Sequence, residues 1–169
     1  MKLISILILF SLNAFAFNCE DAYLLRWKKE QDSSALVQKL IQNRLEENKP
    51  IVVDIGGEGR YADAININPQ PLRPDTMYIQ DIIPNWIPAK AQKLPFKPHT
   101  VDQIYLENAP VTKEILIEIK RVLKKDGKLR LTHPESFSSE IFPWVREVFS
   151  GRSIWQQFHN EVQATIIVN

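Results

Sequence analysis

The side chains best suited to chemistry gather where a short apolar run gives way to glycines. Asp54 directly follows the β-branched run 51–53, and Gly56, Gly57 and Gly59 come within the next five residues. Glycine permits a sharp turn and lets a ligand approach the backbone with no Cβ in the way. A carboxylate beside such a loop can hold an ammonium group, directly or through water. The segment predicts a ligand-binding loop; the alternative is that Asp54 caps the turn and the glycines only permit its geometry.

His133 is the second candidate for chemistry. It comes just after the run 128–132, which alternates apolar and polar side chains as a strand does. Ligands of open α/β sheets bind outside the carboxyl ends of the strands, where an imidazole can act as a general base. The alternative is a histidine that only forms a hydrogen bond within its loop. His99 and His159 fall in predicted turns, and we assign them no role.

Composition excludes several classes of function. Lys plus Arg number 21 and Asp plus Glu 20, so the formal charge of +1 argues against nucleic-acid or membrane-surface binding through bulk charge. The single cysteine excludes an intrachain disulfide framework, and with scattered histidines no metal site is predicted. The sequence contains no G-x-S-x-G elbow and no P-loop, which argues against a hydrolase or a nucleoside triphosphatase.

The first sixteen residues have the layout of a secretory signal peptide. Lys2 supplies a positive charge, residues 3–12 are almost entirely apolar, and Ala14-Phe15-Ala16 is a small-x-small ending. A membrane anchor would need about 20 apolar residues, so no membrane span is expected after cleavage. The protein is therefore predicted to be exported, to a periplasm or outside the cell. The alternative is an uncleaved chain that works as a cytoplasmic enzyme.

Cys19 lies three residues beyond the predicted cleavage site. A cysteine just after an apolar stretch raises the alternative of a lipoprotein, but bulky Phe17 stands where small residues are expected. The interpretation we favour is a thiol near the start of the mature chain, able to pair between chains.

The elements that must position these residues alternate between strand and helix. We expect a helix over 20–47, broken near 32–34, and then strands at 51–53, 64–68, 86–87, 101–106 and 128–132, helices at 112–125 and 138–149, and a hairpin of 154–158 with 162–168. Gly127 suits the left-handed position after the helix 112–125, and Pro143 is tolerable only in the first turn of the next helix.

This alternation predicts one α/β domain after the targeting segment. We expect a Rossmann-like, mostly parallel sheet with helices on both faces and a C-terminal antiparallel hairpin. Residues 1–16 form the signal peptide, 17–49 an N-terminal helical segment, and 50–169 the α/β domain.

Three stretches, in this order, carry a family resemblance. They are the glycine motif 52–59, Leu94-Pro95-Phe96 with the strand 101–105, and the helix-to-strand junction 118–129. The sequence resembles the class I S-adenosylmethionine-dependent methyltransferases over about half its length. The resemblance implies S-adenosylmethionine as cofactor and transfer of its methyl group to an acceptor that the sequence does not identify.

The resemblance also implies roles for individual residues. The cofactor would contact Asp54, Gly56, Gly57, Gly59, Asn66, Asn68, Gln92 and Leu94, with the two asparagines at the place of the family's ribose-binding acid. Asn108, in Glu107-Asn108-Ala109-Pro110, is similar to the first residue of the Asn-Pro-Pro-Tyr motif of amino-directed methyltransferases, and it joins His133 as a catalytic candidate. The alternative for Asn108 is an ordinary turn.

Departures from the family pattern keep two functions open. Glu58 and Arg60 occupy positions where the family has glycines, Asn66 and Asn68 carry no charge, and the chain between Asp54 and Asn66 is too short for the usual helix. The first hypothesis is a methyltransferase, which after export would be an effector-like enzyme. The second is a secreted methyltransferase-like binding module without catalysis. The methyl acceptor and the oligomeric state are left open.

Overall fold

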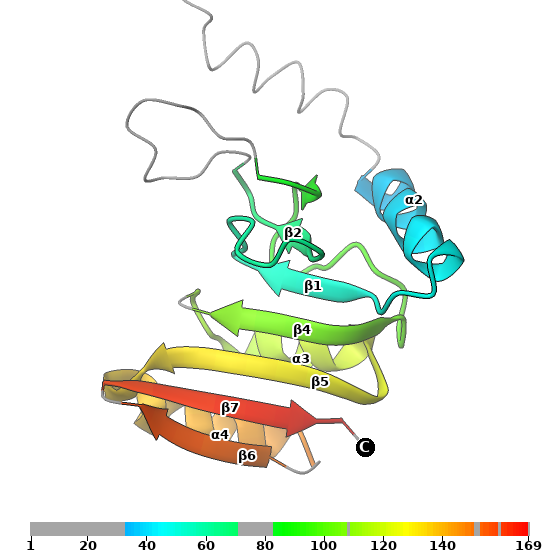
Figure 1. The fold of residues 1–169 in the computed structure, drawn as a ribbon. Helices are drawn as coiled ribbons and strands as arrows, with labels where there is room; N and C mark the ends of the chain where they lie inside the picture. The colour runs from blue at the N-terminus through cyan, green and yellow to red at the C-terminus, as the bar shows by residue number, and fades with distance from the viewer. Residues whose placement is uncertain (1–32, 71–82, 108, 151–152, 159, 169) are drawn as a thin grey trace, which may run out of the picture. The chain divides into compact units, whose positions relative to one another are not determined.

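The computed structural model describes residues 33–70, 83–107, 109–150, 153–158 and 160–168 (Figure 1). The predicted signal peptide 1–16, Cys19 and Asn108 lie outside these residues. Within the described ranges, no helix is both long enough and apolar enough to cross a membrane.

A seven-stranded sheet, in the order β3-β2-β1-β4-β5-β7-β6, forms the centre of the fold. Its strands are β1 (Val52–Ile55), β2 (Ile65–Ile67), β3 (Trp86–Ile87), β4 (Val101–Glu107), β5 (Leu123–Pro134), β6 (Ser153–Phe158) and β7 (Glu161–Ile167). The first five are parallel, and β7 and β6 form an antiparallel hairpin beside β5. The predicted Rossmann-like sheet with its C-terminal hairpin is confirmed.

The two faces of the sheet differ in chemistry because side chains alternate along each strand. Partners on one face are apolar and buried, as in the row Ile55, Leu106 and Leu131. Figure 1 shows α3 (Lys113–Val122) and α4 (Ser138–Val148) behind β4, β5, β7 and β6, and their buried side chains join the same core. The other face carries polar partners, including Asp54.

Local signals explain where the helices begin. α2 (Ser33–Glu46) lies close to β3, where the Ser33 hydroxyl donates a hydrogen bond to the Pro88 carbonyl at 3.3 Å. The predicted helix before residue 33 lies outside the described residues. Thr112 is the N-cap of α3, and its hydroxyl accepts a hydrogen bond from the Ile115 amide at 3.4 Å.

Two details of the prediction are wrong. α3 ends at Val122 instead of Lys125, and the chain passes straight into β5 at Leu123, whose backbone is extended. Asp126, with φ of 61°, and not Gly127 has the left-handed backbone, and both residues lie within β5. Gly127 is needed for space, since a Cβ there would lie 2.8 Å from the Lys124 carbonyl oxygen.

The second wrong detail is Pro143. It lies in the second turn of α4, after a short 3-10 helix, η1 (Glu135–Phe137), and not in the first turn. Since proline has no amide hydrogen, one backbone hydrogen bond of the helix is lost at this place.

An irregular segment with turns joins β3 to β4, and hydrogen bonds hold it against α3. Leu94 and Phe96 are buried in the core. The Leu94 amide donates to Glu118 at 2.7 Å, and Arg121 donates to the carbonyl oxygens of Phe96 at 2.9 Å and Leu94 at 3.1 Å. Two side chains of α3 thus pair the backbone of a segment that has no helix or strand of its own.

Candidate functional site

The glycine loop leaves the carboxyl end of β1 and folds back toward β2. Gly56, with φ of 74°, donates its amide to the Ile67 carbonyl at 2.8 Å, and Gly59 has φ of 80°. Such backbone angles are strained for any residue with a Cβ. The glycines at these two positions therefore permit the turn that the sequence predicts.

Asp54 lies beneath this loop with only 4% of its surface exposed. Burial raises the pKa of its carboxyl group to about 6, against the opposing effect of the nearby Arg60 guanidinium. A positive charge close to a buried carboxyl group favours its ionised form, so a further cation beside Asp54 would lower the pKa of that group. The predicted role of Asp54 in holding an ammonium group stays a prediction.

Asn66 secures the loop. Its amide nitrogen donates to the carbonyls of Pro84 at 2.7 Å and Ala64 at 3.2 Å, and its oxygen accepts from the Gly59 amide at 3.3 Å. A Cβ on Gly57 would overlap the Asn66 side-chain oxygen and lie 2.7 Å from the Asp54 carboxyl carbon. The Asn66 side chain is fully buried, and its hydrogen-bond partners are backbone groups of the surrounding loops.

Asn68 follows β2 at the same edge of the sheet and is half-buried. Its side-chain oxygen accepts from the Gln70 amide at 3.0 Å, and its carbonyl accepts from the Trp86 indole at 2.7 Å. Of the two predicted asparagines, Asn68 is therefore the more accessible one and the better placed to meet a ligand.

The other predicted cofactor residues lie on the segment between β3 and β4. Gln92 is exposed. Leu94 is 3% exposed, its side chain is part of the core, and its backbone is paired with α3. The structure thus places the Leu94 side chain in the core and leaves Gln92 accessible.

A cluster around Glu107 was not found by sequence reasoning. The Glu107 carboxylate accepts hydrogen bonds from Arg60, at 2.5 Å, and from the Tyr61 hydroxyl, at 2.7 Å. Tyr61 also stacks on Tyr105 with ring centroids 3.8 Å apart, and the Arg130 guanidinium lies 6.0 Å from the Tyr105 ring centre. Burial, together with the bond to Glu107, raises the pKa of Tyr61 to about 12. These contacts hold Arg60 and Tyr61, which follow the glycine loop, against β4.

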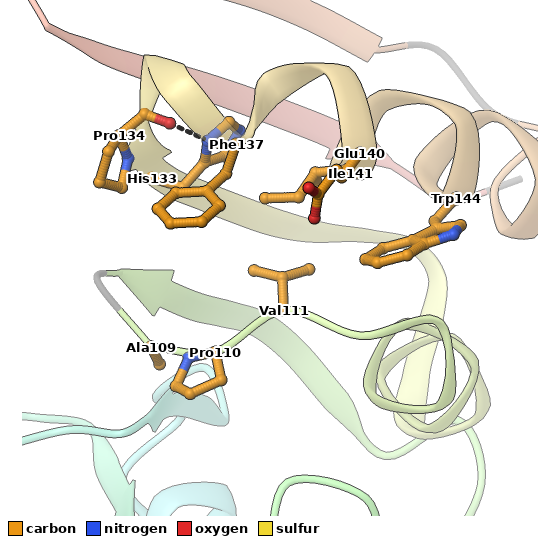
Figure 2. Close-up of a pocket in the computed structure, with 9 residues that line it drawn as sticks. All are labelled: Ala109, Pro110, Val111, His133, Pro134, Phe137, Glu140, Ile141 and Trp144. Carbon is orange, nitrogen blue, oxygen red and sulfur yellow. Dashed lines mark hydrogen bonds between the residues drawn. The ribbon is translucent and has the colours of Figure 1, made fainter.

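A cavity of about 460 Å³ opens at the carboxyl ends of β4 and β5 (Figure 2). Its walls come from the segment after β4, from the end of β5, and from η1 and α4. The lining residues are Ala109, Pro110, Val111, His133, Pro134, Phe137, Glu140, Ile141 and Trp144. Of the two predicted catalytic residues, His133 lines this cavity, and Asn108 precedes a lining residue but is itself outside the described ranges.

The glycine loop and the wall of the cavity meet at one point. A Cβ on Gly56 would lie 2.9 Å from the Cβ of Ala109. The loop predicted to hold a cofactor is therefore in direct contact with the segment that borders the cavity.

His133 is 3% exposed, and its ring is held in place from two sides. Nδ1 lies 2.8 Å from the Pro134 carbonyl oxygen, and the Phe142 ring meets the imidazole edge-on with centroids 6.2 Å apart. Nε2 is buried and has no hydrogen-bond partner within the part of the chain that the structure describes. His133 therefore forms the local hydrogen bond of the alternative interpretation, and its role as a general base stays a prediction.

No group of three or more metal-ligating side chains is found among the described residues.

Comparison with known proteins shows which solved structures have a similar fold. No family model matches the sequence, and no curated protein matches it. Among solved structures, an S-adenosylmethionine-dependent methyltransferase from Aquifex aeolicus is similar, with a TM-score of 0.54 and 14% identity over 82% of this chain and 99% of that one. Another from Thermotoga maritima, described as a possible histamine N-methyltransferase, has a TM-score of 0.52 and 12% identity over 88% and 98%. The chain therefore has the Rossmann-like fold found in these methyltransferases.

Proposed function

We propose that this protein is an S-adenosylmethionine-dependent methyltransferase. One observation carries the proposal: in a fold shared with such enzymes, the glycine loop beside Asp54 touches the wall of the cavity that His133 lines. A methyltransferase needs two adjoining sites, one for the cofactor and one for the acceptor, and this arrangement supplies both.

The residues at the loop fit the cofactor in part. Asp54 would hold its ammonium group, and the amide of Asn68 would meet the ribose hydroxyls at the end of β2. The glycines keep the backbone open to close approach, since φ of 74° and 80° at Gly56 and Gly59 goes with the absence of a Cβ. When bound, S-adenosylmethionine would supply an already activated methyl group. The protein's part is then to orient the acceptor and to exclude water, with His133 able to take a proton.

Calorimetry with S-adenosylhomocysteine, the demethylated cofactor, tests the site. We expect the purified protein to bind it, and the double variant Gly57→Val, Gly59→Val to lose that binding, because a Cβ on Gly57 would displace the Asn66 and Asp54 side chains and a Cβ on Gly59 would strain the turn. Ile117→Ala, an exposed change on α3, is the matched control and should bind as the unmodified protein does. No detectable affinity of the unmodified protein at millimolar ligand would refute the proposal.

A second candidate function is a methyltransferase-like binding module without catalysis. It is favoured by the way Asn66 and Gly57 pack, since the buried amide already pairs with the surrounding loops. Transfer of a labelled methyl group to any pool of small molecules, proteins or nucleic acids would exclude this candidate. Binding of S-adenosylhomocysteine without any transfer would support it.

We also propose that the protein is exported through the segment 1–16. Support comes from the single charge, the apolar stretch and the small-x-small ending of this segment. N-terminal sequencing of the protein isolated from its own cells should give Phe17 as the first residue. An intact Met1 would instead favour the cytoplasmic alternative.

A further inference from the structure

The cavity at the ends of β4 and β5 has one carboxylate in a largely apolar lining. Of the described residues that line it, Glu140 is the acidic one, and Phe137 and Trp144 supply aromatic rings. Glu140 and Trp144 are four residues apart on α4, and Phe137 precedes Glu140 by three residues, so the three side chains share one side of this segment. Figure 2 shows the Glu140 carboxylate between the two rings, on the side that faces Val111.

The accessible polar side chain of this lining is that of Glu140. Glu140 is exposed, Trp144 is partly exposed, and Phe137 leaves 52% of its surface exposed. His133, in contrast, is 3% exposed, and its Nε2 is buried. A ligand that enters the cavity therefore meets the carboxylate and the two rings first.

No cation among the described residues pairs with this carboxylate. Within those ranges, no hydrogen bond or ion pair reaches the Glu140 side chain. Lys113, two residues after Val111, is already paired with Glu147, with 2.5 Å between Nζ and Oε1. The cavity thus presents a negative charge for which the described part of the chain supplies no partner.

A carboxylate between aromatic rings attracts an organic cation in two ways. The carboxylate forms a charge-assisted hydrogen bond with an ammonium group, and the faces of aromatic rings attract the same positive charge. The apolar remainder of the lining suits the hydrocarbon part of such a ligand. The volume of about 460 Å³ is within the range of pockets for small ligands, which is about 300–1,000 Å³.

We infer that the cavity binds small amines in their ammonium form, with the charged group at Glu140 and the hydrocarbon part against the apolar lining. The inference rests on the proposed function in one respect only: such an amine would be the methyl acceptor. For transfer, the ammonium would lose a proton to water, the nitrogen lone pair would form the new N–C bond, and the C–S electron pair would stay on sulfur, leaving S-adenosylhomocysteine. The binding itself requires no cofactor.

Two probes that differ in charge test this inference. 2-Phenylethylamine is a cation at pH 7.5, whereas 2-phenylethanol has the same ring and chain and also donates a hydrogen bond, but is neutral. We expect the purified protein without cofactor to bind the amine about tenfold more tightly than the alcohol, as one accessible ion pair with a cation–π contact implies. NMR titration measures both affinities, and the shift of the Trp144 indole N–H shows that the probe lies in this cavity.

Three variants separate the charge of Glu140 from the space of the cavity. Glu140→Gln keeps the shape of the side chain and removes its charge, so the preference for the amine should disappear while the alcohol binds as before. Glu46→Gln makes the same change on an exposed side chain of α2, outside the lining, and should keep the preference. Val111→Trp places a large side chain in the cavity and should abolish binding of both probes.

A purely structural role of Glu140 gives a different result. An acidic residue in the first turn of α4 stabilises the helix without any ligand. In that case Glu140→Gln would lower Tm and leave both affinities unchanged, which would overturn the inference.

Other outcomes would also overturn the inference. They are equal affinity for the two probes, no binding of the amine at millimolar concentration, a preference that Glu46→Gln also abolishes, and displacement of the amine by S-adenosylhomocysteine, which would assign the cavity to the cofactor. Should Val111→Trp not fold, the Trp144 indole N–H of the unmodified protein locates the probe alone. Failure of the proposed function would look different, because S-adenosylhomocysteine would not bind while the amine still did.

Discussion

Asp54 is a carboxyl group whose charge depends on its environment near neutral pH. Burial raises its pKa to about 6, so the folded protein holds a proton there that a solvated aspartate would already have released. A cation arriving at the loop must meet the ionised form. Binding of an ammonium group and release of this proton are therefore coupled.

The sign of that coupling gives the first prediction. Ligand affinity should be full from about one pH unit above the pKa of Asp54 and fall as pH drops through that pKa of about 6, because protonation removes the charge that attracts the ammonium. Affinity for S-adenosylhomocysteine at pH 5 should be about tenfold lower than at pH 7.5, since one pH unit below the pKa leaves about a tenth of the group ionised. Calorimetry at a series of pH values measures this. Asp54→Asn should bind weakly with no such dependence, and a flat profile for the unmodified protein would contradict the role of Asp54.

Asn66 and Asn68 are two residues apart and should respond differently to the same substitution. Asn66→Ala removes the partner of Pro84, Ala64 and Gly59 in a fully buried place, which should lower the free energy of unfolding by about 2–3 kcal/mol. Asn68→Ala loses one bond, to the Gln70 amide near the surface, and should cost about 1 kcal/mol or less.

Urea unfolding and ligand calorimetry on the same two variants test the assignment. Asn68→Ala should weaken S-adenosylhomocysteine binding at nearly unchanged stability. The assignment fails if Asn68→Ala binds normally while Asn66→Ala stays fully stable but loses affinity.

Among the elements, the segment between β3 and β4 is held by α3. Glu118 and Arg121 bond to each other at 2.6 Å and also pair the backbone of Leu94 and Phe96. The Arg121 guanidinium holds the pKa of Glu118 below its ordinary value. Because a lowered acid pKa stabilises the folded state only while the group is ionised, this contribution is present above pH 4.5 and is lost as pH falls further.

The effect of removing the Arg121 guanidinium tests how the segment between β3 and β4 is held. Arg121→Gln should lower the free energy of unfolding by about 2 kcal/mol at pH 7, since two backbone carbonyls and one carboxylate lose their donor. The difference from the unmodified protein should shrink below pH 4.5. Denaturant unfolding at pH 7 and pH 4 measures both values, with the exposed Lys125→Gln as the control that should change little. A deficit that grows toward low pH would contradict the assigned ion pair.

The sequence predicts the presence of the helices and strands more accurately than the residues at which they begin and end. Short β-branched runs such as 51–53 identify buried strands, and the helix expected to begin at residue 112 does begin there, with Thr112 as its N-cap. The end of α3 was misplaced because residues 120–125 are rich in lysine and arginine, as at a helix C-terminus. Strand pairing of Leu123 with Val101 overrides that local preference.

Only the part of the candidate site whose residues are close together in the sequence was predicted. Asp54 and its glycines lie together in the sequence, so their spacing indicates a loop. Glu107 meets Arg60 and Tyr61 only because β4 lies beside β1, and these pairs are 47 and 46 residues apart in the chain. No local pattern records such contacts, and the same holds for the aromatic walls that Phe137 and Trp144 give the cavity.

At the scale of the whole molecule, the proposed cofactor site joins elements that are distant in sequence. Asp54 lies in β1 one residue before its end, Asn68 follows β2, and Ala109, which follows β4, lies against the Gly56 turn, so these three residues come together only when the sheet is assembled. A ligand that needs all three binds the folded chain and not the unfolded one. Its binding must then raise the stability of the whole domain.

That linkage gives the last prediction. S-adenosylhomocysteine at one hundred times its dissociation constant should stabilise the fold by about 2.7 kcal/mol, and for a chain of this size Tm should rise by about 5–10 °C. Calorimetric melting of the unmodified protein, of Ile117→Ala and of Gly57→Val, Gly59→Val tests this. The first two should shift alike, and the double variant should melt at the same temperature with and without ligand. A shift that persists in the double variant would place the ligand elsewhere on the molecule, because the loop that should hold it would already be blocked.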